Sequence, residues 1–475
     1  MENIQGAACN GNRLQKKKVI VVGAGIAGLH SASLLMARGF DVVVLEVRDR
    51  VGGRILTDRE DSGCIDLGAS WMHATAYNPL VKLISQLGIE YYYDDGSPLY
   101  FTEFGPAGPN FKAVNVTDEF IDYLNYWLQK NPHGPDISAE HHIRSFVDQH
   151  QLITEDDKQW APEALKIVEN TLGLPLNEIS SMFLNEMLPP QRDLYVKGGY
   201  DKVVNFVGST VINSPGTVLY NQIVERVVWD RTTEPNAIAL DVRHAKDGST
   251  TTFEADAVII TVPLGVLQRN KLLFKPEVPA DIASGISKIS YGALGKVIFE
   301  FADVFWSKHN DNLIYIPTPA SLAEESECHK YPVLSQCFVA TNLWVMSDAR
   351  KICVLLSPPV VHEVESMGSN QQQLFEYFEP LLELFRTEPY KSLPRMIEAK
   401  VTSWTKDEFA GFGTYSTAKV GDDPRVLWDA LDKNTSSRLQ FAGEHCSRTG
   451  TGCVHGAYET AQIAAENITR LFGSN

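Results

Sequence analysis

The sequence predicts an α/β fold, in which a parallel sheet with helical crossovers is combined with a second, mixed part of the chain. Two continuous apolar, β-branched runs at residues 19–22 and 42–45 have the pattern of strands buried on both faces. Between them stand a glycine-rich turn and a helix-like segment, so the two strands are expected to pair in parallel through a right-handed crossover. A chain of 475 residues is too long for one ordinary core, so two interleaved domains are expected.

The remaining elements follow from periodicity and from residues that begin or end helices. The first helix is expected at 29–38, because Gly39 stands where a helix C-cap belongs. Residues 117–190 are expected to form a mostly helical insertion, and Pro162 suits the first turn of its helix, where no N–H partner is lost. Further helices are expected at 118–129, 162–170, 371–387 and 457–471. Further strands are expected at 217–220, 238–243, 257–262, 293–301, 352–356 and 439–444.

Composition narrows the class of protein. The 42 Lys and Arg against 59 Asp and Glu give a net charge of −17, which repels nucleic acid and attracts cations, including a polycationic small molecule. No apolar run reaches the roughly 18 residues of a membrane span. We therefore expect a soluble acidic enzyme that binds neither nucleic acid nor membrane. The sequence sets no oligomeric state, and a homodimer is compatible with it.

Cysteine usage predicts the compartment. The seven cysteines are odd in number and form no C-x-x-C pair, so neither a disulfide framework nor a zinc site is expected. His141–His142 and Cys328–His329 have no partners at ligand spacing, so no metal is expected. A reducing compartment, the cytoplasm, is the expected location. The carboxyl end, Phe-Gly-Ser-Asn, is not the usual peroxisomal signal, and a peroxisomal location by another signal stays open.

The glycine-rich turn has the spacing of a dinucleotide fingerprint. Gly23 makes the tight turn, Gly25 lets a pyrophosphate approach the backbone, and Gly28 lets helix and strand pack closely. The N-terminus of the helix offers free N–H groups and its positive dipole end to phosphate. Glu46, at the end of the second strand, can accept hydrogen bonds from a ribose diol. The strand-helix-strand unit is therefore predicted to bind a dinucleotide.

The next segment favours FAD over NAD. Residues 48–54 read RDRVGGR, and their two glycines and arginines, Arg48 and Arg54, suit a second contact with the pyrophosphate. A charged surface loop is the alternative interpretation. A nicotinamide dehydrogenase has no need of such an element.

Several blocks along nearly the whole chain resemble the flavin-containing amine oxidase family. They are residues 19–54, Gly68-Ala69-Ser70-Trp71, Val224, Trp404, Gly413-Thr414-Tyr415-Ser416 and Phe441-Ala442-Gly443-Glu444-His445. The run 291–301, YGALGKVIFEF, is most similar to the yeast (fungal) polyamine or spermine oxidase branch.

The resemblance implies a fold of the amine oxidase type, with a discontinuous Rossmann-like FAD-binding domain and an inserted mixed α+β substrate domain. After a flexible leader at 1–15, the FAD-binding domain would take residues 16–90, 195–285 and 400–475. The substrate-binding domain would take residues 91–194 and 286–399.

The resemblance also implies how the cofactor is held. Val224 would contact adenine through its backbone, Glu444 would lie near the ribityl and pyrophosphate groups, and the backbone N–H of Val454 would reach the isoalloxazine edge. Thr414 stands where monoamine oxidases have the cysteine that bonds to flavin, so the FAD should be non-covalent. The remaining cofactor contacts would come from Gly68, Ala69, Ser70, Trp71 and Trp404.

Three residues match positions that act in the family's reaction. Lys296 matches the lysine that holds a water beside flavin N5, His73 the histidine near the substrate nitrogen, and Tyr415 the aromatic residue beside the flavin face. Lys296 as a surface side chain and His73 as a structural residue are the alternatives. Cys453 takes the place of a second aromatic residue next to Tyr415, which would leave a wider slot for a long aliphatic amine.

Asp94 and Asp95 follow three tyrosines and are a further candidate. On one interpretation they anchor a distal ammonium of the substrate. On the other they are solvated surface residues.

The activity that the resemblance implies is polyamine oxidation. Spermine or an acetylated polyamine would lose hydride to flavin N5, and dioxygen would reoxidise the flavin. The products would be a shorter amine, an aminoaldehyde and hydrogen peroxide. One alternative is a steroid-binding flavoprotein of the same fungal branch with weak or no amine oxidase activity. A histone-lysine demethylase is another, although it would need added chromatin-binding modules.

Overall fold

One half of the molecule is built on a five-stranded parallel sheet. The computed structural model describes residues 16–60, 63–94, 96–108, 111, 115–149, 155–184, 192–230, 238–318, 322–323 and 330–473. In order across the sheet, the strands are β10 (Val218–Leu219), β2 (Asp41–Leu45), β1 (Lys18–Val22), β14 (Ala257–Ile260) and β23 (Leu439–Phe441). Every pairing is parallel, as predicted for β1 and β2, because the chain returns through helix α1 (Ile26–Ala37).

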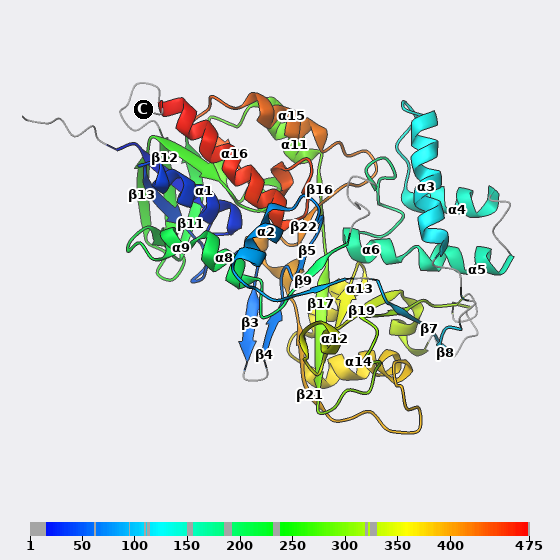
Figure 1. Ribbon diagram of the computed structural model, residues 1–475. Coiled ribbons are helices and arrows are strands. Elements are labelled where there is room, and N and C mark those ends of the chain that lie inside the picture. Colours follow the sequence, from blue (N-terminus) through cyan, green and yellow to red (C-terminus); the bar gives the residue numbers. More distant parts are fainter. Residues whose placement is uncertain are drawn as a thin grey trace, which may run out of the picture.

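The two faces of this sheet are covered differently. Val19 and Val21 of β1 pack under α1 and the long carboxy-terminal helix α16 (Val454–Phe472), which run side by side in Figure 1. Ile20 and Val22 pack on the opposite face against a second, four-stranded sheet. That sheet consists of β13 (Thr250–Ala255), β12 (Ile238–His244), β11 (Gln222–Val228) and β15 (Leu273–Lys275).

Helix α1 begins three residues earlier than predicted. Gly25 is extended, at φ −70° and ψ 178°, and acts as the N-cap, so the helix already includes Ile26. The predicted C-terminal glycine is confirmed in position, since Gly39 follows the C-cap Arg38 and has φ +85°.

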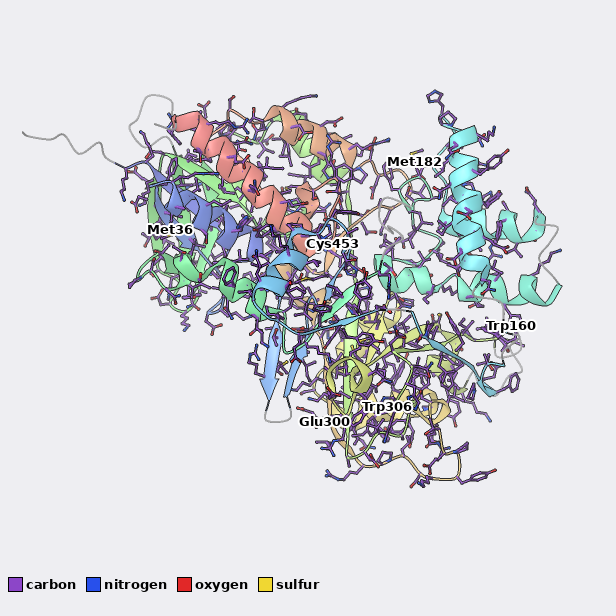
Figure 2. All side chains as sticks on the ribbon, viewed as in Figure 1. Met36, Trp160, Met182, Glu300, Trp306 and Cys453 are labelled. Carbon is purple, nitrogen blue, oxygen red and sulfur yellow. The ribbon has the colours of Figure 1, made fainter. Side chains whose placement is uncertain are left out.

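A seven-stranded sheet forms the second half of the molecule. Its strands in order are β21 (Met396–Val401), β17 (Gly295–Phe301), β20 (Lys351–Leu356), β19 (Phe338–Asn342), β18 (Asn312–Tyr315), β7 (Leu99–Thr102) and β8 (Gly105–Pro106). Helices α13 (Val360–Met367) and α14 (Gln371–Leu384) share its core, in which Trp306 is buried (Figure 2). The two large sheets draw on alternating stretches of the chain, and the domain boundaries given above stay predictions.

A helical group lies to one side of the seven-stranded sheet and has its own core. It contains α3 (Asn115–Lys130), α4 (Ala139–Gln149), α5 (Glu155–Ala164) and α6 (Ile167–Leu172). The predicted single helix at 162–170 is wrong, because Pro162 lies inside α5 and not in a first turn. Proline has no N–H to continue the helical ladder, so the turn is weakened. The helix ends two residues later, and α6 starts afresh.

Three small sheets connect the two halves. They pair β3 (Thr57–Glu60) with β4 (Gly63–Asp66), β16 (Ser290–Gly292) with β22 (Tyr415–Thr417), and β9 (Leu194–Val196) with both β5 (Trp71–Met72) and β6 (Tyr91–Tyr93). Within the described ranges, the remaining α-helices are α2 (Pro79–Gln86), α8 (Asp201–Val207), α9 (Ser209–Ile212), α10 (Leu264–Gln268), α11 (Ala280–Ser287), α12 (Leu343–Ser347) and α15 (Arg425–Lys433). None of the helices in the described ranges has the length and apolar character needed to cross a membrane.

Candidate functional site

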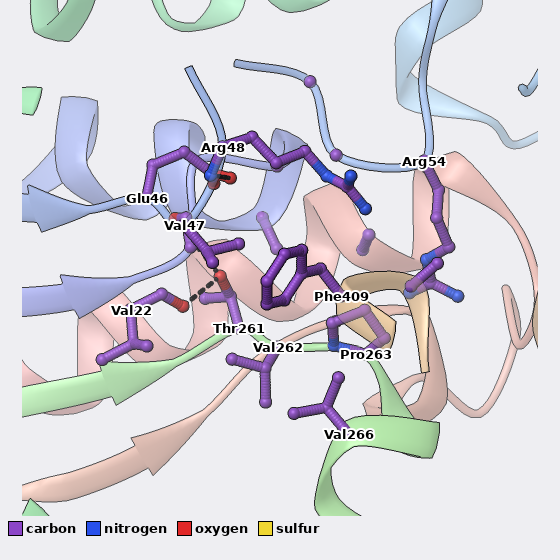
Figure 3. Close-up of a pocket in the computed structure, with 18 of the residues that line it drawn as sticks. Val22, Glu46, Val47, Arg48, Arg54, Thr261, Val262, Pro263, Val266 and Phe409 are labelled. Atoms are coloured by element: carbon purple, nitrogen blue, oxygen red, sulfur yellow. Dashed lines mark hydrogen bonds between the residues drawn. The ribbon is translucent and has the colours of Figure 1, made fainter. Parts of the chain in front are cut away.

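A cavity of about 720 Å³ opens at the carboxyl ends of the parallel strands. This is the edge at which open α/β sheets bind their ligands. Residues from both halves of the molecule line the cavity. Figure 3 shows the part of its wall that contains Glu46, Arg48 and Arg54. The candidates that line it are Gly23, Gly25, Glu46, Arg48, Arg54, Gly68, Ala69, Val224, Lys296, Trp404, Glu444, Cys453 and Val454.

The glycine turn leaves room for a ligand on one side and is packed tightly on the other. A Cβ placed on Gly25 meets no atom within 4 Å, so the backbone there is open to the cavity. A Cβ on Gly28 would lie 1.9 Å from the carbonyl oxygen of Gly23. Gly28 therefore keeps α1 against β1, and Gly25 provides the cradle in which a pyrophosphate fits.

Glu46 is held rigidly at the end of β2. Its carboxylate accepts hydrogen bonds from the backbone N–H of Ala24 at 2.6 Å and of Arg48 at 2.9 Å. Burial raises the pKa of Glu46, and these two hydrogen bonds oppose that rise. The carboxylate thus links the glycine turn to the segment after β2, and its remaining lone pairs are available to a ribose diol.

The two predicted arginines on the cavity wall, Arg48 and Arg54, are each paired with an acid. Arg48 lies 2.7 Å from Asp407 and over the ring of Phe409, whose side chain Figure 3 shows between Arg48 and Arg54. Arg54 Nη1 donates to Glu444 at 2.7 Å. Each pairing holds a guanidinium at the cavity.

Glu444 is the centre of a buried polar network. Besides Arg54, the N–H of Gly452 donates to it at 2.9 Å and the hydroxyl of Ser416 at 3.1 Å. Burial alone would raise the pKa of Glu444, but the charge of Arg54 and these hydrogen bonds hold that pKa below its usual value. Glu444 therefore stays ionised and fixes the glycine-rich segment before α16.

Lys296 extends from β17 to the cavity and binds the turn after β4. Its Nζ donates to the carbonyl oxygens of Asp66 at 2.9 Å and Gly68 at 2.6 Å, and to the hydroxyl of Ser70 at 2.6 Å. Burial lowers the pKa of Lys296. The alternative of a surface lysine is therefore wrong.

Trp404 binds the same turn from the other side, because its indole N–H donates to the carbonyl oxygen of Leu67 at 2.9 Å. Ser70 and Trp71, which follow the turn, are not among the cavity-lining residues. Ser70 accepts from Lys296, and Trp71 packs edge-on against Tyr195 with ring centroids 5.4 Å apart.

His73 forms an ion-pair contact that sequence analysis missed. Its Nδ1 lies 2.7 Å from Asp193, which stands directly before β9. The charge of Asp193 also raises the pKa of the Cys453 thiol, although burial is the larger cause and brings that pKa to about 12. Asp193 is therefore in direct contact with His73 and near enough to Cys453 for its charge to act on the thiol.

Asp94 and Asp311 extend this acidic group. The N–H of Asp94 donates to the backbone oxygen of Asp193 at 3.0 Å. Burial, followed by the charges of Asp311 and Asp193, raises the pKa of Asp94 to about 6. Asp311 is fully buried; the N–H of Ser97 donates to its Oδ2 at 3.2 Å, while its Oδ1 has no hydrogen-bond partner. Asp95, the other predicted anchor, lies outside the described residues.

Tyr415 lies beside the cavity wall rather than in it. Its hydroxyl donates to the carbonyl oxygen of Thr171 in α6 at 2.7 Å, which ties β22 to the helical group. A Cβ on Gly452 would lie 3.5 Å from the Tyr415 ring, so the ring is next to the segment that contains Cys453.

Among the described residues, no group of three or more His, Cys, Asp or Glu side chains could hold a metal ion. Cys328–His329 lies outside those residues. His142 packs edge-on against Trp127 with ring centroids 4.4 Å apart.

A parallel sheet, a glycine turn with an open cradle and an acid at the end of β2 define a dinucleotide-binding protein of the α/β class. The cavity extends beyond the dinucleotide cradle to Lys296 and Trp404 from the other half of the molecule.

Comparison with known proteins identifies the family. The model of the flavin containing amine oxidoreductase family matches residues 26–469. The chain therefore belongs to this family. The predicted membership is confirmed, the cofactor class is a flavin, and the substrates of the family are small-molecule amines.

Three similar proteins illustrate the range within the family. The Corticosteroid-binding protein of Candida albicans, a fungus, is 26% identical over 485 residues, which cover 96% of each chain. Polyamine oxidase 3 of Oryza sativa subsp. japonica is 30% identical over 467 residues, covering 94% of this chain and 88% of that protein. The Lysine-specific histone demethylase 1 homolog 1 of the same plant is 27% identical, and this chain spans 53% of its length.

The fold is similar to that of a solved putrescine oxidase, the wild type bound to putrescine. The TM-score is 0.69 at 19% identity, with 95% of this chain and 99% of that chain covered. The predicted amine oxidase fold, with a flavin-binding and a substrate domain, is confirmed.

Proposed function

We propose that this chain is an FAD-dependent polyamine oxidase that oxidises spermine or an acetylated polyamine. The reaction consumes one amine, one dioxygen and one water. It yields a shorter amine, an aminoaldehyde and one hydrogen peroxide. The observation that carries the substrate class is the acidic group formed by Asp193, Asp94 and Asp311 next to His73.

This acidic group suits an elongated polycation. Asp193 is close enough to the cavity wall to raise the pKa of Cys453, and Asp94 is influenced by both Asp193 and Asp311. The three carboxylates and His73 thus form one group near Cys453 on the cavity wall. A distal ammonium beside Asp94 would offset the repulsion between the charges of Asp94, Asp311 and Asp193. This arrangement favours spermine, whose far end is charged, over a substrate acetylated at that end.

The residues on the cavity wall fit FAD. The open backbone at Gly25 suits the pyrophosphate, Glu46 the ribose, and Arg48 and Arg54 the phosphate charge. When bound, FAD supplies the two-electron acceptor for hydride from the carbon beside the amine nitrogen. We propose that it is held without a covalent bond, because the Thr414 hydroxyl donates to Gly292 at 3.1 Å and accepts from Leu294 at 2.9 Å.

The chain's own residues manage the proton on the substrate. Asp193 fixes His73 through Nδ1, which leaves Nε2 as the ring atom that exchanges a proton with the amine nitrogen. The amine must lose its proton before hydride can leave the adjacent carbon. Lys296 and Trp404 hold the turn at 66–70 through hydrogen bonds to its carbonyl oxygens.

Steroid binding is the second candidate function, favoured by the likeness to the Candida albicans protein over nearly the whole chain. A corticosteroid carries no charge, so it would not offset the mutual repulsion of the three carboxylates in the acidic group. That cost is why we place amine oxidation first.

The first experiment mixes the purified holoprotein with spermine without oxygen and follows the visible absorbance of the flavin. We expect rapid bleaching that oxygen reverses, and a repeat with spermidine and acetylspermine ranks the substrates. Absorbance that no polyamine bleaches, together with saturable binding of a labelled corticosteroid, would instead establish the second candidate.

The matched variants are Asp94→Asn, in the acidic group, and Asp122→Asn, an exposed carboxylate on α3. We expect Asp94→Asn to raise KM for spermine about tenfold, equivalent to about 1.4 kcal/mol, and to affect an acetylated far end much less. Asp122→Asn should leave KM unchanged. Equal effects of the two variants would refute the role of the acidic group.

A further inference from the structure

A buried carboxylate behind the cavity wall binds the segment that contains Trp404. Glu365 in α13 is only 2% exposed and does not line the cavity. Its Oε1 accepts from the hydroxyl of Thr402 at 2.8 Å and from the backbone N–H of Trp404 at 3.1 Å. Its Oε2 accepts from the backbone N–H and the hydroxyl of Thr405, at 2.9 and 2.5 Å. One side chain thus fixes the chain after β21 at four points.

Two of these contacts continue to the cavity. The Thr402 hydroxyl, which donates to Glu365, accepts from the backbone N–H of Lys296 at 3.0 Å. The indole of Trp404 donates to Leu67, which lies between the two carbonyl groups that accept from Lys296 Nζ. Glu365 is therefore connected to the turn at 66–68 by two independent routes, one through each cavity residue.

The surrounding packing gives Glu365 little freedom. A Cβ on Gly295, directly before Lys296, would lie 2.6 Å from Val361 and 3.3 Å from Glu365 Oε1. Helix α13 therefore lies directly against the start of β17. All four partners of the carboxylate donate, so both of its oxygens must act as acceptors, and an uncharged carboxamide would present its NH₂ group to two of those donors.

We propose that Glu365 is a positioning residue that sets where Lys296 and Trp404 stand in the flavin cavity. The carboxylate of Glu365 is linked to Lys296 through the hydroxyl of Thr402. It is linked to Trp404 directly, because it accepts from the backbone N–H of Trp404. It thereby sets the surroundings that a bound flavin meets on this side. The flavin follows from the family, and only the use of dioxygen as acceptor rests on the proposed function.

The test compares Glu365→Gln with Glu363→Gln, a matched change at an exposed position of the same helix. Each holoprotein is reduced with dithionite, mixed with oxygen, and followed by flavin absorbance; the reduction potential is measured separately. For Glu365→Gln we expect a changed flavin spectrum and potential, and reoxidation slower by about tenfold. Glu363→Gln should match the wild type. A Glu365→Gln protein with wild-type spectrum, potential and reoxidation would overturn the proposal.

A double-mutant cycle tests whether the effect passes through Lys296. Adding Glu365→Gln to Lys296→Met should slow reoxidation by clearly less than the tenfold expected in the wild-type background, because only the route through Trp404 remains. A further tenfold loss in that background would mean that Glu365 acts by another route, and the proposal would be wrong.

Changes at Thr402 keep the proposal testable if Glu365→Gln does not fold. Thr402→Val removes the hydroxyl that joins Glu365 to Lys296 and should slow reoxidation, whereas Thr402→Ser keeps the hydroxyl and should restore the wild-type rate. Equal behaviour of these two variants would overturn the proposal. Dithionite reduction needs no amine, so a chain that no polyamine reduces would refute the proposed function and still leave this comparison intact.

Discussion

The substitutions Gly25→Ala and Gly28→Ala should have different effects on stability, although both glycines belong to the same motif. Gly28 lies where α1 packs on β1, and Gly25 lies where the backbone faces the cavity. Gly28→Ala should therefore reduce both stability and flavin binding. Gly25→Ala should reduce flavin binding alone.

The loss of stability expected for Gly28→Ala follows from one distance. The added Cβ would lie 1.9 Å from the carbonyl oxygen of Gly23, about 1.1 Å short of the 3.0 Å below which real Cβ contacts essentially never occur. The obstacle is backbone, which cannot rotate aside, so α1 must move away from β1. Overpacking of this kind typically costs about 1 to 3 kcal/mol. The shift also moves the helix N-terminus away from the phosphate that it is predicted to bind.

Gly25 carries neither cost. Its φ of −70° is accessible to any residue, and no atom lies within 4 Å of the added Cβ. The methyl group would occupy the place of the pyrophosphate. We expect at least tenfold weaker flavin binding, equivalent to about 1.4 kcal/mol, at unchanged stability.

The assay separates folding from binding by using protein from which the flavin has been removed. Urea unfolding of the flavin-free chain gives the stability, without the contribution that a bound ligand adds. Fluorescence titration with FAD then gives the affinity. Gly28→Ala with wild-type stability would refute the close-packing argument, and Gly25→Ala with wild-type affinity would show that the cradle does not hold the pyrophosphate.

Three further predictions concern charged groups. The ring of His30 is stacked on that of Tyr458 with centroids 3.7 Å apart, and burial lowers the pKa of His30 to about 4. In the unfolded chain this histidine takes up a proton below a pH of about 6.5, whereas in the folded chain it stays neutral. The free energy of unfolding therefore falls as the pH drops. The loss is about 2 kcal/mol between pH 7 and 5, and urea unfolding should show it absent in His30→Phe. Asp311→Asn should remove a charge that raises the pKa of Asp94, so the pH below which KM for spermine increases should shift below about 6 in steady-state assays. Glu444→Gln leaves Arg54 without its carboxylate, and urea unfolding should show the free energy of unfolding lowered by about 3 kcal/mol.

Local patterns predicted the flavin-binding half of the molecule well, because there each function depends on a short stretch of chain. Continuous apolar runs identify parallel strands, and the glycine spacing identifies the turn between β1 and α1. The predicted single helix at 162–170 was wrong because apolar periodicity alone does not locate the ends of a helix. Its apolar periodicity continues across Pro162, whereas α5 begins before Pro162 and ends at Ala164, and α6 begins at Ile167.

The residues that sequence analysis missed share one property: their partners are distant in the sequence. Asp193 pairs with a histidine 120 positions earlier, and Ser97 donates to Asp311 across 214 positions. Neither aspartate belongs to a motif, and an isolated acid in a polar segment is usually a surface residue. Asp311 differs from an ordinary surface aspartate because it is fully buried. That burial depends on the pairing of β18 with β7, which the sequence does not reveal.

The same property explains why Lys296 could be found from its motif, whereas Glu365 could not. Lys296 interrupts an apolar strand, so its cost in free energy is visible in the sequence. The contacts that offset the burial of Lys296 come from the turn at 66–70, which accepts hydrogen bonds from Nζ. The backbone N–H of Lys296 is in turn bound by Thr402, whose hydroxyl donates to Glu365. A carboxylate on an amphipathic helix such as α13 has no comparable signal, because helices carry acids on their exposed faces as a rule. The two acids of this helix, Glu363 and Glu365, differ only in the direction they face, and that direction decides which one supports the flavin cavity.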